Sequence, residues 1–298
     1  MLTIRRLLFP TDFSEGAARA FPQAATLAAR HDAELHVLNV TGPHTETETT
    51  LPVSLDTLHE WLGPDAPKNG PDLNALPVVQ NQVDGDAVPE RITAYVEEQA
   101  IDLVVMGTHG RRGVQRMLLG SVTEEVVRTV ACPVLTVRSD TAENAYRAVR
   151  RILVPVDFSD ASKVAVRHAN ALAQTYDAHL DLLHVVEQVA YPSAYGVDPG
   201  YHSPQEIIPR VETSLGELAR DDLGSENVTV SATVGYAPLT ILDYVDEKDV
   251  DLVVIATHGR TGLDRMLLGS VAERVIRRSS APVFVVKPEQ KSLLPAAS

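Results

Sequence analysis

The feature that most constrains the fold is an internal repeat. The stretch Leu7-Leu-Phe-Pro-Thr-Asp-Phe-Ser14 recurs as Ile152-Leu-Val-Pro-Val-Asp-Phe-Ser159, and Thr108-His-Gly-Arg111 recurs as Thr257-His-Gly-Arg260. A period near half the chain is too long for a solenoid, so each copy should have its own core. We therefore predict two tandem domains, residues 1–140 and 148–290, which meet in the polar stretch 139–144.

Each copy alternates predicted strands with helices. Helices begin at Ser14 and Ser159 after the first strands, because Asp and Ser there suit an N-cap. Residues 102–106 and 251–255 each begin with an aspartate and are apolar from the second residue on, which is typical of parallel strands covered on both faces. The predicted strands are 7–9, 34–40, 78–83, 102–106 and 134–137, then 152–156, 180–186, 228–234, 251–255 and 283–286.

This order predicts an α/β fold of two doubly wound, five-stranded parallel sheets, Rossmann-like, in tandem. A ligand crevice is expected at the carboxyl ends of the strands. The last strands would otherwise leave open edges, so we expect them to pair within the chain. The stretches 41–73 and 187–209 differ most between the copies and predict surface insertions.

Composition excludes several classes of protein. Hydrophobic residues make up 44% of the chain, yet no apolar run reaches the ~20 residues that span a bilayer. The net charge of −14 opposes general binding to nucleic acid or anionic lipid. We expect a cytoplasmic protein. Cys132 is the one cysteine, which excludes an intrachain disulfide, and Pro133 beside it favours a packing role.

A glycine motif follows the fourth strand of the first copy. Gly107-Thr-His-Gly110 is followed by nine residues and then by Gly120-Ser121 at a helix start. Glycines let the backbone approach a polyphosphate closely and can adopt positive φ. The first helical N–H groups are unpaired donors, and a serine hydroxyl can donate to phosphate or ligate Mg²⁺. An acidic protein can still capture phosphate in this local way.

This G-x2-G-x9-G-[ST] pattern resembles the nucleotide signature of the universal stress protein family. The resemblance extends to Pro10-Thr-Asp-Phe-Ser14, Leu38-Asn-Val40 and Cys132-Pro133-Val134, and covers both copies almost end to end. It implies adenine nucleotide alpha hydrolase-like domains that bind ATP or another adenine nucleotide, with Mg²⁺ held through the phosphates near Ser121. The residues it implies for the first site are Pro10, Thr11, Asp12, Val40, Gly107, Gly110, Gly120, Ser121 and Val122.

The second copy departs from this pattern at one position, where Ala256 replaces the first glycine. We expect Ala256 to be extended with negative φ, and its methyl to weaken binding by crowding the ribose or phosphate. Ser270 is the second expected contact of Mg²⁺. The residues implied for the second site are Pro155, Val156, Asp157, Val185, Ala256, Gly259, Gly269, Ser270 and Val271.

Histidines and arginines in the glycine loops admit two interpretations. His109 and His258 either shape the loop or act as acid or base, and their duplication favours loop shaping. Five arginines either contact phosphate or are solvated: Arg111, Arg112, Arg116, Arg260 and Arg265.

Known catalytic signatures do not occur in the sequence: it has no Walker loop, dinucleotide fingerprint, nucleophile elbow or H-E-x-x-H zinc pair. We therefore expect no catalytic residues. By resemblance the protein is a nucleotide-dependent stress-response regulator or sensor, with a homodimer of chains as a further expectation. The alternatives are a slow Mg²⁺-dependent ATPase or nucleotide hydrolase, and a structural family member that has lost its ligand.

Overall fold

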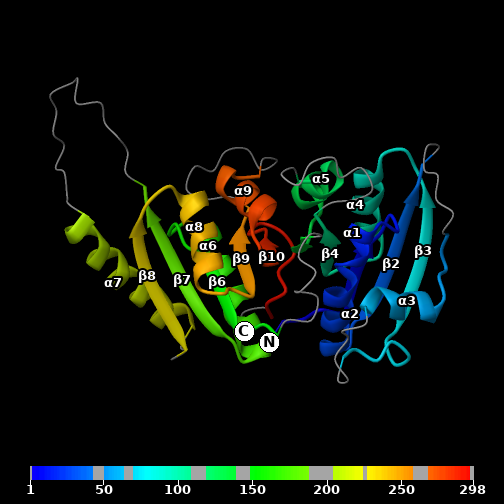
Figure 1. Ribbon diagram of the computed structural model, residues 1–298, viewed down its shortest axis with the longest axis horizontal. Coiled ribbons are helices and arrows are strands. Elements are labelled where there is room, and N and C mark those ends of the chain that lie inside the picture. Colours follow the sequence, from blue (N-terminus) through cyan, green and yellow to red (C-terminus); the bar gives the residue numbers. More distant parts are fainter. Residues whose placement is uncertain are drawn as a thin grey trace.

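The computed structural model describes residues 2–42, 50–63, 70–108, 119–138, 148–187, 204–223, 227–257 and 268–295. The strands form one ten-stranded sheet in the order β3-β2-β1-β4-β5-β10-β9-β6-β7-β8 (Figure 1). Their bounds are β1 Arg6–Pro10, β2 Glu34–Thr41, β3 Val78–Asp84, β4 Leu103–Gly107, β5 Val134–Val137, β6 Arg151–Pro155, β7 His179–Val186, β8 Val228–Val234, β9 Leu252–Ala256 and β10 Val283–Val286.

Within each half the five strands are parallel, which confirms the predicted fold class. The halves join where β5 pairs with β10 in antiparallel register, with Phe284 opposite Leu135. The predicted pairing of the last strands is thereby present within one chain. It turns two five-stranded sheets into a single sheet and leaves β3 and β8 as its edges.

Helices cover both faces of the sheet, and each face has one apolar core that runs through both halves. On one face lie α1, α2, α3, α6 and α7, and on the other α4, α5, α8 and α9. The bounds are α1 Glu15–Ala18, α2 Phe21–Arg30, α3 Leu55–Leu62, α4 Val88–Glu98, α5 Ser121–Thr129, α6 Asp160–Tyr176, α7 Pro204–Leu223, α8 Ala237–Glu247 and α9 Ser270–Arg278.

The single helix expected from Ser14 is wrong for the first copy. Two helices, α1 and α2, stand there, whereas the second copy has the continuous helix α6. Pro22 lies in the first turn of α2 and has no N–H to continue the hydrogen bonding of α1, so the helix breaks. Arg167 stands at the equivalent place in α6, where no such break occurs.

Two basic side chains form hydrogen bonds between the halves, next to the β5–β10 pair. Arg138, after β5, donates to the carbonyl of Arg278 at the end of α9. Lys287, after β10, donates to the carbonyl of Val130 at the end of α5. The helix dipole favours a cation at a helix C-terminus, although burial opposes the charge of Lys287 and lowers its pKa. The two basic residues are equivalent in the repeat, and their acceptor carbonyls differ by one position, so each half caps a helix of the other.

The segment that follows β10 returns to the first half. Lys291 Nζ lies 2.6 Å from Asp102 Oδ1 and also donates to the carbonyls of Ala100 and Ile101. The Thr3 N–H donates to the Leu293 carbonyl at 2.8 Å, which places the N- and C-terminal regions side by side (Figure 1). In the described part of the chain, no helix is long and apolar enough to span a bilayer.

Candidate functional site

The loop after β1 is fixed to the end of β2. The Thr11 N–H donates to the Leu38 carbonyl at 2.8 Å, and Asn39 Nδ2 donates back to the Thr11 carbonyl at 2.8 Å. Asn39 is buried, and its Oδ1 has no hydrogen-bond partner. These bonds bring Asp12, which follows Thr11, beside Val40 at the carboxyl edge of the sheet.

The end of β4 is fixed to the start of α5. The Gly120 N–H donates to the Thr108 carbonyl at 2.8 Å, and Thr123 Oγ1 donates to the Gly107 carbonyl at 2.9 Å. Because β4 pairs with β1, Gly107, Gly120 and Ser121 lie at the same edge as the loop after β1. The structure thus brings together the described residues that sequence analysis assigned to the first site.

The starts of α5 and α9 carry the most informative feature of this edge. Gly120 and Gly269 are their N-caps, and no side chain accepts a hydrogen bond from either first turn. The other N-caps in the described part of the chain show either a capping serine, as in α1, α3 and α6, or a proline in the first turn. Uncapped first turns leave N–H donors at the positive end of the helix dipole, which suits an anion.

Gly120 and Gly269 do not use the positive φ that glycine can adopt. Gly120 has φ −60° and ψ 137°, and Gly269 has φ −60° and ψ 142°, which is extended backbone open to any residue. Neither position therefore needs glycine for its backbone conformation.

Gly107 is required for a different reason. A Cβ atom there would lie 2.6 Å from the Gly16 carbonyl oxygen in α1. The missing side chain therefore makes room for the backbone of α1. In the second copy Ala161 and Ala256 replace this pair of glycines, and Ala256 has no positive φ, as expected. A Cβ at the equivalent Gly107 would point at the helix, whereas the expected crowding of ribose or phosphate by the Ala256 methyl stays a prediction.

The second copy builds the same edge. The Val156 N–H donates to the Leu183 carbonyl at 2.8 Å, and the Gly269 N–H donates to the Thr257 carbonyl at 2.8 Å. His184 stands where the first copy has Asn39, and its Nδ1 lies 2.7 Å from the Val156 carbonyl. Since a carbonyl only accepts, Nδ1 carries the proton. Asp157 and Val185 therefore lie beside each other at the carboxyl edge of the second half, as Asp12 and Val40 do in the first.

A strained residue that the sequence motifs did not indicate lies in each site. Phe13 and Phe158, directly after the two aspartates, have φ of 60° and 64°. This left-handed conformation is rare for a bulky residue and tends to occur at functional sites. Asp12 Oδ1 and Asp157 Oδ1 accept the N–H of the serine two residues on, which closes the turn around each phenylalanine. The duplicated Asp-Phe-Ser sequence was the available signal.

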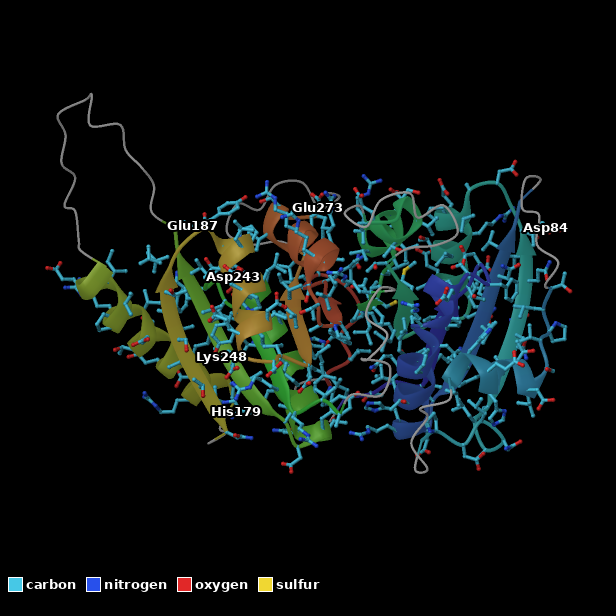
Figure 2. All side chains as sticks on the ribbon, viewed as in Figure 1. Asp84, His179, Glu187, Asp243, Lys248 and Glu273 are labelled. Carbon is cyan, nitrogen blue, oxygen red and sulfur yellow. The ribbon has the colours of Figure 1, made fainter. Side chains whose placement is uncertain are left out.

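Carboxylates also lie at this edge. Figure 2 labels Asp84 and Glu187, at the ends of β3 and β7, on the upper side of the view with Glu273 of α9, whereas His179 lies on the lower side. Backbone N–H groups at the helix starts can hold an anion here although these side chains repel it. Among the described residues, no group of three or more His, Cys, Asp or Glu side chains gathers as a metal site.

Several predicted residues lie outside the described part of the chain. They are Gly110 and Gly259 of the glycine motif, His109 and His258, and Arg111, Arg112, Arg116, Arg260 and Arg265.

Comparison with known proteins decides the family. The model of the universal stress protein family matches residues 3–138 and again residues 148–287. The chain belongs to the universal stress protein family. It carries two copies of the family's domain in tandem, and the α/β architecture of its sheet agrees with that membership.

Named relatives support this membership. A universal stress protein of Methanocaldococcus jannaschii is 33% identical over 156 residues, which cover 50% of this chain and 86% of that protein. A universal stress protein of Mycolicibacterium smegmatis is 30% identical over 214 residues, which cover 70% of this chain and 69% of that protein. A solved universal stress protein of Archaeoglobus fulgidus aligns with a TM-score of 0.63 at 23% identity, over 95% of this chain and 98% of that one, so the tandem fold is shared.

Proposed function

We propose that the protein binds an adenine nucleotide, ATP first among them, at the carboxyl edge of each half. The observation that carries the proposal is the pair of uncapped helix starts at Gly120 and Gly269, each beside the loop that follows the first strand of its half. The first-turn N–H groups of α5 and α9 would hold the phosphates. The glycine pattern of the family supports the same assignment.

The remaining predicted residues would hold the nucleoside. Asp12 and Val40 would border the adenosine in the first half, as Asp157 and Val185 would in the second. Ser121 and Ser270 open the two helices, so each hydroxyl stands next to the proposed phosphates. Mg²⁺ fits such a site through phosphate oxygens and one hydroxyl, because it usually keeps several waters and needs few protein ligands. When bound it would neutralise phosphate charge beside the carboxylates of this edge.

The proposed role is that of a nucleotide-dependent regulator or sensor of the stress response rather than an enzyme. Hydrolysis needs a placed base or water-orienting group besides a phosphate site. The one acidic side chain predicted in the first site, Asp12, accepts the Ser14 N–H and so holds its own loop. We further propose that the chain works in the cytoplasm and associates as a homodimer.

Nucleotide carried through purification tests the proposal. The purified protein is denatured, and the released small molecules are separated by chromatography and identified by mass. We expect ATP or another adenine nucleotide, and no production of ADP when the nucleotide-free protein is mixed with substoichiometric ATP and Mg²⁺. Stoichiometric ADP formation would favour the hydrolase. The absence of any bound nucleotide, together with no uptake of millimolar ATP, would contradict the proposal.

A further inference from the structure

The two site loops share one backbone shape but contact different parts of the protein. Phe13 and Phe158 both have positive φ, so each loop adopts a conformation that its sequence resists. The ring centroid of Phe13 lies 6.0 Å from that of Trp61 in α3. The ring centroid of Phe158 lies 5.0 Å from that of His184, on the strand of its own half. A different neighbour therefore packs on each strained phenylalanine.

Trp61 belongs to an aromatic cluster of four rings: Phe9, Phe13, Phe21 and Trp61. Its ring lies 6.1 Å from Phe9 and 5.5 Å from Phe21, and both phenylalanines are fully buried. Edge-to-face and tilted pairs at such distances are favourable. The second copy has Val154 and Val166 in place of Phe9 and Phe21. The cluster is therefore a feature of the first half.

The segment that carries Trp61 is anchored to the rest of the first half. Leu58 and Leu62 of α3 are buried in the core, and α3 lies beside α2 on the same face of the sheet (Figure 1). Val53 exchanges two hydrogen bonds with the side chain of Gln80 on β3, at 2.8 and 3.1 Å. With these anchors, Trp61 is held in place when Phe13 packs against it.

We propose that Trp61 is a positioning residue for the first nucleotide site. Through Phe13 it holds the loop of Thr11 to Ser14 in the strained shape that places Asp12 at the nucleotide, so residues 50–63 of the insertion 41–73 set the affinity of this site alone. The inference rests on the proposed function. The loop can adopt the strained, binding-competent conformation or a relaxed one. A contact that exists only in the strained conformation raises the population of that conformation, and the ATP affinity rises with that population.

The test measures ATP affinity by calorimetry in two backgrounds. In Gly269→Val the first site remains, and in Gly120→Val the second site remains. Trp61→Ala is expected to weaken ATP binding tenfold or more in the first background and to leave it unchanged in the second. Trp61→Phe should restore most of the affinity because an aromatic ring returns. Leu55→Ala, on the exposed side of the same helix (46% exposed), is the matched control and should change neither site.

A spectroscopic signature completes the test, because Trp61 is the one tryptophan in the chain. Its fluorescence should change when ATP is added to Gly269→Val and stay constant in Gly120→Val. If Trp61→Ala is unfolded, Phe13→Leu removes the same ring contact and should show the same loss at one site. Equal affinities for wild-type and variant, or equal loss in both backgrounds, would overturn the inference. Failure of the wild-type protein to bind ATP would instead refute the proposed function.

Discussion

The carbonyl oxygen of Gly16 lies 2.6 Å from the position that a Cβ on Gly107 would occupy. This relationship joins helix α1 to the strand whose end carries the glycine motif. It shows that the first glycine of the motif serves packing between backbone segments. The spacing of α1 from β4 therefore depends on two glycines that the second copy does not have.

Gly107→Ala should destabilise the protein by about 1–3 kcal/mol, the usual cost of forcing a methyl into a packed interior. The helix backbone must shift, since no flexible side chain is there to give way. Urea unfolding measures the change. Ala256→Gly is the matched control: it removes a buried methyl and adds backbone freedom, so it should cost about 1–2 kcal/mol without any clash. If Gly107→Ala has the same free energy of unfolding as the wild type, the space between position 107 and the Gly16 carbonyl can accept a methyl group, which would contradict the prediction.

Gly120→Val should leave the protein folded while it weakens ATP binding at the first site by at least tenfold. Valine adopts φ −60° and ψ 137° without strain, and its branched side chain would stand where the phosphates meet the start of α5. Thermal unfolding should show a loss of stability within about 1 kcal/mol, the scale of a changed N-cap. Wild-type affinity in the folded variant would refute the phosphate site at Gly120.

The sheet could be predicted because both copies of the repeat show the same alternation of apolar strand segments and helices. The apolar runs at β4 and β9 and the last strands of the two halves, β5 and β10, lie where they were expected. The Gly16–Gly107 contact could not be predicted, because it depends on how helix α1 packs on β4. For the strained Phe13, the duplicated Asp-Phe-Ser sequence was the one available signal. Pro22 was an available signal that the first helix would divide, because proline breaks a helix interior and is tolerated only in a first turn. The side-chain geometry was needed to show that Asn39 bonds to the Thr11 carbonyl in the first copy and that His184 bonds to the Val156 carbonyl in the second.

Lys287 predicts a pH dependence of stability. Burial lowers the pKa of this lysine to about 8, from an ordinary 10.5. Below pH 8 both states hold the proton; between pH 8 and 10.5 the folded protein has released it and the unfolded chain retains it. The free energy of unfolding should therefore rise over this range because of Lys287, by an amount on the order of 3 kcal/mol.

Comparison with Lys287→Met isolates this contribution, because all other titrating groups are shared. The difference in unfolding free energy between wild-type and variant should shift in favour of the wild type from pH 7.5 to pH 10. A difference that stays constant over that range would show that the lysine is not buried as described.

Cys132 should resist thiol reagents while the protein is folded. The side chain is fully buried, and burial raises the pKa of its thiol to about 12, so the reactive thiolate is scarce at neutral pH. Ellman's reagent should react slowly with native protein and rapidly with one thiol per chain in denaturant. Rapid reaction in the native state would indicate that the β5–β10 region opens readily.

The number of adenine nucleotides bound per chain tests the central claim most directly. Native mass spectrometry of nucleotide-free protein with excess ATP and Mg²⁺ should count two per wild-type chain. Each of Gly120→Val and Gly269→Val should bind one, and the double variant none. A wild-type chain that binds no nucleotide, or a folded double variant that still binds two, would contradict the assignment of the sites to the starts of α5 and α9.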